Sequence, residues 1–306
     1  MIESKLKSAG KVIRRDRSLI IMIFPVILYY ILFHYKPMYG ILIAFKDFSI
    51  SKGILRSEWA GLKYFIQFFE SPFLGRLLRN TFSISIYGLL WGFPAPILFA
   101  LFLNEMKNGF YKRLVQTASY LPYFISTVVV VGMIFNLLSP QTGIVAKFIK
   151  EFGGTPVNYM TSTRYFRTIY IASSIWKGFG IDSIIYLAAL SGIEQEQYEA
   201  ATIDGASRLK QTLHITIPGI MPTMIILLIL SLGKLMSVGY EKIILMYSPA
   251  IYEVADVIST YTYRKGILET QYSFASAVGF FNSVINFVML VVFNKISRRV
   301  SEISLW

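Results

Sequence analysis

Six stretches of mostly apolar residues, each about long enough to cross a bilayer as a helix, constrain this chain more than any other feature. A helix that crosses roughly 30 Å of hydrocarbon needs about 20 mainly apolar residues. Lys234 interrupts the fifth stretch and makes it the weakest. The predicted spans are Leu19–Tyr39, Thr81–Leu103, Tyr120–Leu138, Thr168–Leu190, Pro222–Leu235 with its continuation, and Phe274–Phe293. The predicted fold class is an all-α integral membrane protein with six transmembrane helices.

The composition fits a chain surrounded by lipid. Of its 306 residues, 55% are apolar and 15% are charged, whereas soluble domains average about 25% charged residues. The net charge of +13 comes from basic residues that flank the apolar spans, and this arrangement favours anionic lipid headgroups over nucleic acid as the partner. The absence of cysteine excludes disulfides and thiolate chemistry. His34 and His214 lie far apart, so no metal site is predicted.

Both chain ends are predicted to lie in the cytoplasm. An even number of spans places them on one side, and the densest basic clusters are the N-terminal segment and the tail Lys295–Arg299. The first apolar run continues from Leu19 beyond Phe33 without a small-residue cleavage site, which indicates a retained helix. No internal repeat or linker is visible. We expect a cytoplasmic basic N-terminus over residues 1–18 and a single transmembrane domain over residues 19–306.

The longest predicted outside connection, Lys46–Arg79, is rich in aromatic residues. It suits an amphipathic helix that lies in the membrane interface. Such a helix either braces the bundle or contacts a partner protein, and the sequence leaves both roles open. The residues that favour the interface are Trp59, Gly61, Leu62, Tyr64, Phe65, Phe68 and Phe69.

The connection between the fourth and fifth spans, residues 191–220, has the pattern of a helix-turn-helix on the membrane surface. Its run of Glu, Gln and Ala favours a helix, and Gly205 suits the left-handed residue that ends one. The segment Ala206–His214 is predicted to form a second short helix, before Pro218 and Pro222 start the next span.

The first of these helices has a surface that another protein can approach closely. Ala200 and Ala201 have no bulk, and Glu199 offers a charge for an anchoring hydrogen bond. The spacing resembles the coupling-loop motif of binding-protein-dependent ABC importer permeases. The family usually has Leu where Ile217 stands, and Ile keeps the apolar role. The matching positions are Glu199-Ala200-Ala201, three residues, Gly205, nine residues, Ile215, one residue and Ile217-Pro218.

The resemblance extends over nearly the whole chain and is strongest with the six-helix, maltose-permease-like permeases that take up oligosaccharides. Within this class, Lys36-Pro37-Met38-Tyr39-Gly40 and Phe45-Lys46-Asp47-Phe48 are similar to a subgroup for complex polysaccharide fragments, such as pectin-derived or uronate-containing oligosaccharides. The resemblance implies the type I ABC importer permease fold, with the coupling helix-turn-helix in the cytoplasm of a bacterial cell.

The same resemblance implies partners. These are a second homologous permease subunit, two ATPase subunits, an extracellular solute-binding lipoprotein and the oligosaccharide itself. The chain contains no Gly-x-x-x-x-Gly-Lys-Ser/Thr loop. We therefore expect a pathway-forming subunit that is not an enzyme and binds no cofactor of its own, with ATP and magnesium held by the partner ATPase.

A sugar site needs aromatic platforms with hydroxyl or amide partners, and the fourth span supplies such residues, among them Ser174 and Asp182. In related maltose-type permeases a Trp-x-Gly contributes to the sugar site, and Trp176-Lys177-Gly178 matches it. Ser231 stands where the family often places a sugar-contacting hydroxyl. Asn282, on the sixth span, is the last substrate candidate. It lies one helical turn before Asn286, and polar residues at this spacing also commonly hold helices together.

Several alternatives stay open. A charged group inside a span is costly and faces protein or a watery cavity, so Lys177 meets either an acidic sugar or a carboxylate of the partner subunit. The rival functions are a secondary transporter driven by an ion gradient, which predicts inverted halves, and an ABC permease for a solute that is not a sugar. A membrane enzyme needs a nucleophile, a metal cluster or paired acids, and Asp182 alone does not provide one.

Overall fold

The computed structural model describes residues 16–301, 304 and 305. Most of the predicted basic N-terminus, residues 1–15, lies outside the described residues. Over the described part the regular structure is helical, apart from one short antiparallel pairing of β1 (Lys46–Asp47) with β2 (Glu58–Trp59). This agrees with the predicted all-α fold class.

The helices of the first half of the chain begin with an almost continuous N-terminal helix. It runs through α2 (Arg17–Tyr30), the π-helical η1 (Ile31–Tyr35), α3 (Lys36–Met38) and the 3₁₀-helical η2 (Tyr39–Phe45). The elements that follow are α4 (Gly53–Arg56), α5 (Lys63–Phe69), α6 (Leu74–Gly92), α7 (Pro94–Glu105), α8 (Phe110–Tyr120), η3 (Leu121–Phe124), α9 (Thr127–Leu138), α10 (Ile144–Glu151) and η4 (Tyr159–Thr161).

The second half begins with the long helix α11 (Phe166–Ser191) and ends with the longest one, α18 (Tyr272–Ser301). The elements between them are α12 (Gln195–Ile203), α13 (Arg208–Gln211), η5 (Thr212–Thr216), α14 (Ile217–Leu232), α15 (Tyr240–Met246), η6 (Pro249–Ile251), α16 (Tyr252–Ala255), α17 (Ile258–Tyr263) and η7 (Arg264–Leu268).

Four helices of the described chain are long and apolar enough to cross a membrane, and there are up to five if one bent pair is a single span. The α11 helix is long enough, but Lys177 and Asp182 interrupt its apolar surface and it is not among them. The six predicted spans therefore stay a prediction. The four helices are Arg17–Phe45, Leu74–Glu105, Arg208–Leu232 and Tyr272–Ser301.

The predicted third span, Tyr120–Leu138, is wrong as one straight helix. The chain instead forms two helical segments, Phe110–Phe124 and Thr127–Leu138, and the direction of the chain bends by 101° between them. The cause is local. Pro122 cannot donate a backbone hydrogen bond, and the hydroxyl of Ser126 accepts one from the backbone N–H of Val129 at 3.3 Å, which starts a new helix.

The second and fifth predicted spans need smaller corrections. The second begins earlier, at Leu74, and is interrupted at Phe93 just before Pro94. The separate short helix predicted over Ala206–His214 is wrong, because α13, η5 and α14 form one helix of 25 residues. The π-helical turn η5 lies just before Pro218, whose ring clashes with a regular α-helical turn, and Pro222 lies inside the helix.

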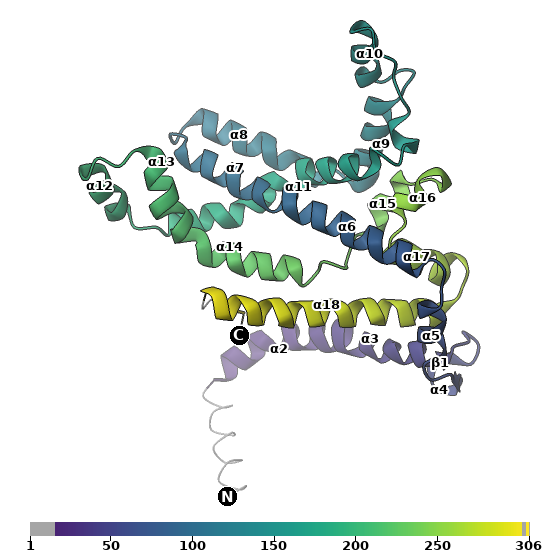
Figure 1. The fold of residues 1–306 in the computed structure, drawn as a ribbon. Helices are drawn as coiled ribbons and strands as arrows, with labels where there is room; N and C mark the ends of the chain where they lie inside the picture. The colour runs from purple at the N-terminus through teal and green to yellow at the C-terminus, as the bar shows by residue number, and fades with distance from the viewer. Residues whose placement is uncertain (1–15, 302–303, 306) are drawn as a thin grey trace, which may run out of the picture.

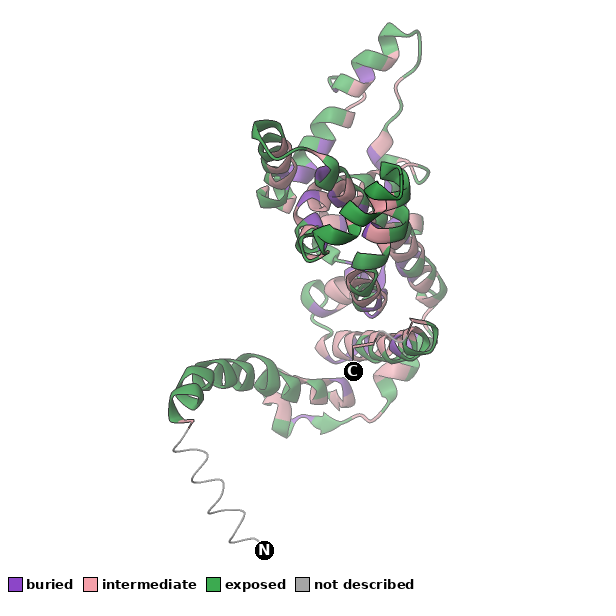
Figure 2. Cartoon of the chain, turned by 90° about the vertical axis from the view of Figure 1, so that its left-hand side faces the viewer, coloured by how far each residue is buried: buried purple, intermediate pink, exposed green. Residues whose placement is uncertain are grey.

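The chain runs back and forth between two ends (Figure 1). The helices α12 and α13, the turn between α7 and α8, and the C-terminal end of α18 gather at one end, together with the beginning of α2. The β1 strand, α4, α5 and α17 lie at the other end. Figure 2 shows α2 extending away from the body of the protein, with every one of its side chains exposed.

The central helix of the body is α11, which packs against α6, α7, α8 and α14. One apolar cluster around Tyr186, Leu190 and Ile220 joins α11 to α14. A second joins α5 and α6 to α17 and α18 through Phe68, which contacts Phe274 and Phe281 edge to face. The aromatic helix predicted within Lys46–Arg79 is thus α5, and its packing against α18 supports the bracing role.

The α8 and α11 helices approach very closely at Gly180. A Cβ atom at this position would clash with the backbone oxygen of Ser119. Backbone cannot move aside as a flexible side chain can, so we expect Gly180→Ala to destabilise the fold by about 1–3 kcal/mol, the usual cost of overpacking. Unfolding of the purified protein in mixed detergent micelles measures the change.

The matched control for this substitution is Gly88→Ala on α6, where a Cβ atom meets nothing within 4 Å. Alanine is the better helix former, so this variant should be neutral or slightly more stable. Equal stability of the two variants would show that α8 and α11 do not touch at Gly180.

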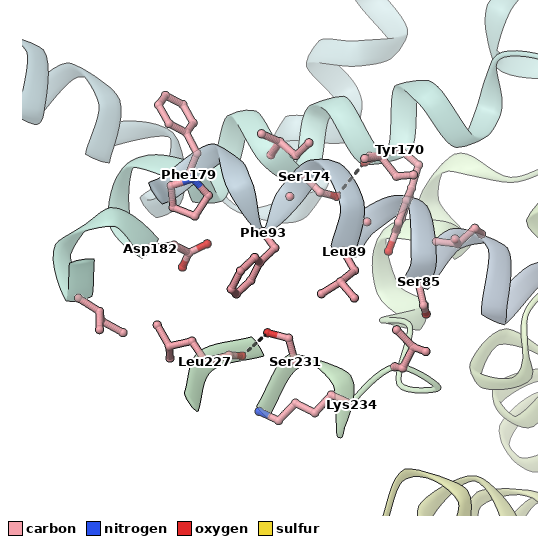
Figure 3. Close-up of a pocket in the computed structure, with 18 of the residues that line it drawn as sticks. Ser85, Leu89, Phe93, Tyr170, Ser174, Phe179, Asp182, Leu227, Ser231 and Lys234 are labelled. Atoms are coloured by element: carbon pink, nitrogen blue, oxygen red, sulfur yellow. Dashed lines mark hydrogen bonds between the residues drawn. The ribbon is translucent and has the colours of Figure 1, made fainter. Parts of the chain in front are cut away.

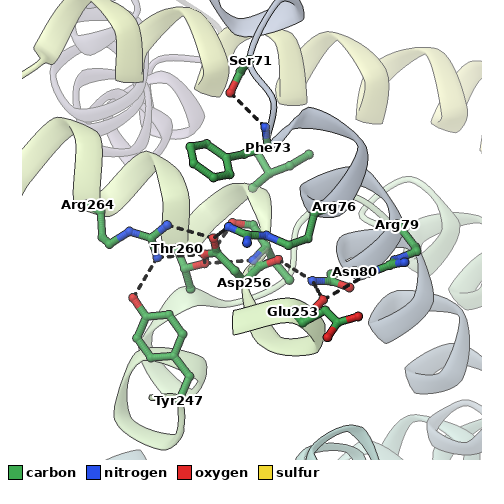
Figure 4. Close-up of polar contacts among 12 residues, drawn as sticks. Ser71, Phe73, Arg76, Arg79, Asn80, Tyr247, Glu253, Asp256, Thr260 and Arg264 are labelled. Carbon is green, nitrogen blue, oxygen red and sulfur yellow. Dashed lines mark hydrogen bonds and ion pairs between the residues drawn. The ribbon is translucent and has the colours of Figure 1, made fainter. Parts of the chain in front are cut away.

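A buried charge network ties the helices together at the end opposite α12 (Figure 4). The Asp256 side chain is fully buried and accepts hydrogen bonds from both Arg264 Nη atoms at 2.8 Å and from Arg76 Nη2 at 3.1 Å. Asn80 Nδ2 donates to the backbone oxygen of Asp256 at 2.9 Å. Burial alone would lower the pKa of Arg264, but its hydrogen bonds to Asp256 and Tyr247 raise it above the ordinary value.

Candidate functional site

A cavity of about 490 Å³ opens between α6, α7, α11 and α14 (Figure 3). Its walls are mostly apolar, with aromatic rings from α11 and from Phe93 between α6 and α7. Its lining residues are Ile84, Ser85, Gly88, Leu89, Gly92, Phe93, Pro96, Tyr170, Ile171, Ser174, Ile175, Phe179, Asp182, Ile185, Tyr186, Leu227, Ser231, Lys234 and Leu235.

Three of the predicted substrate residues meet in this cavity. Ser174 and Asp182 come from α11, and Ser231 lies on the facing wall, on α14. Both serine hydroxyls donate to the backbone one turn earlier, Ser174 to Tyr170 at 2.7 Å and Ser231 to Leu227 at 2.8 Å. The Ser231 oxygen therefore keeps its acceptor capacity, whereas the Ser174 oxygen also accepts from Lys242 Nζ at 2.6 Å.

The remaining predicted substrate residues do not line the cavity. Trp176 is 42% exposed, and the Lys177 Nζ donates to Thr127 Oγ1 at 3.3 Å, toward α9. A Cβ atom on Gly178 would lie 3.0 Å from an Asp182 carboxylate oxygen. The Asn282 amide oxygen is buried and has no partner among the described residues.

Asn286, one turn after Asn282 on α18, has a packing role. Its amide oxygen accepts from the backbone N–H of Met236 at 3.0 Å, and its amide nitrogen donates to Ser237 Oγ at 2.8 Å. Both partners lie just after α14. For this asparagine, the contacts support the packing interpretation of the pair.

Two lysines near the cavity were not among the predicted substrate residues. Lys234 lines it beside Ser231. Lys242, on α15, donates from Nζ to Ser174 Oγ at 2.6 Å and to the backbone oxygen of Tyr170 at 2.8 Å, and stands 4.7 Å from the centre of the Tyr170 ring. No spacing in the sequence connects Lys242 with α11, so only the fold brings them together.

The second candidate site is the helix-turn-helix formed by α12, the turn at Gly205 and the beginning of α13. Gly205 has a φ of +72°, the predicted left-handed stop after α12. Glu199 and Ala200 are exposed and Ala201 is half-buried. Of the later motif positions, Pro218 is exposed, whereas Ile215 and Ile217 are half-buried.

Specific contacts fix α12 to its surroundings. Tyr198 and Thr216 share a hydrogen bond of 3.0 Å between their hydroxyl oxygens. Arg208 Nη1 lies 3.3 Å from Glu105 Oε2, at the end of α7. A groove of about 850 Å³ runs along this face and includes Glu199 and Arg208. Large apolar side chains lie exposed beside it, with Ile203 87% exposed, so this end can dock a protein partner.

Residues 92–302 of the chain match the family described as "Binding-protein-dependent transport system inner membrane component". The chain belongs to this family. The match includes both α12 and most of the cavity-lining residues. This protein is therefore a permease subunit of a binding-protein-dependent transport system, embedded in the membrane.

Two curated relatives of the permease come from Bacillus subtilis (strain 168). It is 41% identical to Protein LplB over 290 residues, which cover 95% of this chain and 91% of the relative. It is 40% identical to the polygalacturonan/rhamnogalacturonan transport system permease protein YteP over 288 residues, which cover 94% and 90%.

The permease also resembles a solved structure, a chain of a bacterial ABC transporter involved in the import of the acidic polysaccharide alginate. The TM-score is 0.88 at 43% identity, over 96% of this permease and 99% of that chain. The same similarity holds for that transporter in complex with an alginate pentasaccharide-bound periplasmic protein. The permease therefore has the fold of an ABC importer permease.

Proposed function

We propose that this permease forms half of the membrane pathway of an ATP-driven importer for oligosaccharides. The observation that supports this best is the likeness to the alginate transporter chain over nearly the full length of both proteins. The relative named for polygalacturonan and rhamnogalacturonan transport supports the same substrate class. No comparable likeness favours the ion-gradient carrier.

The cavity chemistry suits a saccharide. Sugar rings offer weakly apolar faces and many hydroxyls, and Phe93, Phe179 and Tyr186 offer rings beside the hydroxyls of Ser174 and Ser231. We infer that a second homologous permease subunit completes the walls of this cavity. Trp176, Lys177, Gly178 and Asn282 stay candidates for the substrate path in that assembly.

The groove beside α12 is the proposed seat of an ATPase subunit, with one ATPase for each permease subunit. ATP and magnesium are bound by those ATPases in this proposal. The α12 end then faces the bacterial cytoplasm, and the beginning of α2 and the end of α18 lie on the same side (Figure 1). The opposite end, with α5 and α17, faces an extracellular solute-binding lipoprotein.

ATP-driven closure of the ATPase pair would move α12, rotate the two permease subunits and open the cavity outward. Reopening would release the sugar inward. The test is uptake by the complete importer in proteoliposomes, with the binding protein outside and ATP inside. We expect oligosaccharide uptake that requires ATP and persists after ionophores collapse all ion gradients. Uptake that needs a gradient and not ATP would support the carrier instead.

A further inference from the structure

Three lysines lie at or near the cavity, with Lys242 and Lys177 on the side of Ser174 and Lys234 on the facing wall. Lys234 lines it directly, and Figure 3 shows it on the wall opposite Ser174. Lys242 reaches the cavity through its 2.6 Å hydrogen bond to Ser174 Oγ. Lys177 lies three residues after Ser174, on a neighbouring turn of α11, and its Nζ donates to Thr127 Oγ1 at 3.3 Å.

None of the three amines forms an ion pair within the described chain. The ion pairs of the described residues involve other lysines and arginines, and no Asp or Glu oxygen lies within 4.0 Å of these three Nζ atoms. Asp182 is the carboxylate that lines the cavity. Lys234 and Asp182 thus line a space large enough for sugar rings, and Lys242 and Lys177 lie next to its wall at Ser174.

Uncompensated positive charge of this kind is costly at membrane depth, where such groups normally pair or face a ligand pathway. Lys242 is an example, because its side chain is half-buried between α15 and α11. Its neutral hydrogen-bond partners, Ser174 and the Tyr170 backbone, do not offset the charge. An anion placed between the lysines would stabilise all three.

We propose that Lys177, Lys234 and Lys242 bind the carboxylates of an acidic saccharide, so that the cavity selects uronate-bearing chains over neutral ones. This inference rests on the proposed function and adds the substrate class and the residues that determine it. Lys177 and Lys242 hold a carboxylate from the side of α11 and α15, and Lys234 holds one from the side of α14. The ring of Tyr170, beside Lys242, offers a platform for a sugar face.

The test is equilibrium binding to the purified importer complex without its binding protein, so that only the membrane cavity selects. The probes are uronate trisaccharides from polygalacturonan and from alginate, each paired with its carboxyl-reduced, neutral counterpart. We expect wild type to bind at least one acidic trisaccharide more than about 10-fold tighter than its neutral partner, as charge-assisted hydrogen bonds allow. Lys242→Gln should remove most of this preference, and Lys242→Arg should keep it.

Lys177→Gln provides a second, independent variant should Lys242→Gln fail to assemble. The control is Lys147→Gln, which changes an exposed lysine of α10 away from the cavity and should leave the preference unchanged. An equal loss of affinity for acidic and neutral trisaccharides in Lys242→Gln would overturn the inference. So would a failure of both variants to assemble, because the lysines would then pair with the partner subunit.

The two proposals fail in distinguishable ways. ATP-driven uptake of oligosaccharides with no preference for acidic trisaccharides would overturn the inference and leave the proposed function intact. A wild-type complex that binds neither acidic nor neutral trisaccharides, while it imports another kind of solute, would overturn both.

Discussion

Substituting Glu199 by lysine should uncouple ATP hydrolysis from uptake while the membrane fold stays intact. Glu199 is exposed on α12 and lines the groove where we place the ATPase. Reversing a charge at a protein interface costs several kcal/mol, which corresponds to at least a ~100-fold weaker contact. We expect uptake in proteoliposomes to fall by about that factor. ATPase activity should lose its stimulation by the loaded binding protein.

The matched control is Glu196→Lys, which makes the same charge change on the same helix at a residue that does not line the groove. The importer with Glu196→Lys should take up oligosaccharide at close to the wild-type rate. Should Glu199→Lys transport at the wild-type rate in a complex of normal composition, α12 would not be the coupling element.

Removing the Asp256 carboxylate should cause the largest loss of stability that a single substitution produces in this fold. In Asp256→Ala, Arg264 and Arg76 lose their shared partner while both remain largely buried, with side-chain exposures of 20% and 28%. Removing one member of a buried ion pair costs about 3–5 kcal/mol, because the other charge stays in the interior. We expect a destabilisation of this size for unfolding in mixed detergent micelles.

Glu253→Ala is the control for this substitution. Glu253 is exposed, and only its backbone oxygen takes part in the network, as an acceptor from Asn80 at 2.8 Å. Its stability should stay within about 0.5 kcal/mol of wild type. A similar, small effect for both variants would mean that the arginines find other partners at this end of the bundle.

Local patterns in the sequence predicted the parts of the fold that depend on local physics. Gly205 ends α12 in the left-handed conformation because a glycine adopts it without steric cost. The α5 and α11 helices form where aromatic and apolar patterns predicted them. The bend after Phe124 was missed because it depends on a proline and a capping serine inside an otherwise continuous apolar run.

The candidate site was predictable only where a family motif or a buried polar residue gave a signal. Ser174, Asp182 and Ser231 were found in this way, and the fold places them around one cavity. The position of Lys242 depends on how the chain returns after α14 and lays α15 against α9 and α17. This is a long-range property that spacing along the chain does not reveal.

One continuous helix connects the groove beside α12 with the cavity. From Arg208 beside the groove to Ser231 in the cavity wall, the chain stays helical through α13, η5 and α14, a rod of roughly 35 Å at about 1.5 Å per residue. A continuous helix moves approximately as one rigid unit, so a displacement of one end also displaces the other. In the proposed importer, the movement that reaches the cavity from the ATPase should therefore depend on the stiffness of this helix, with the π-helical turn Thr212–Thr216 as its most compliant point.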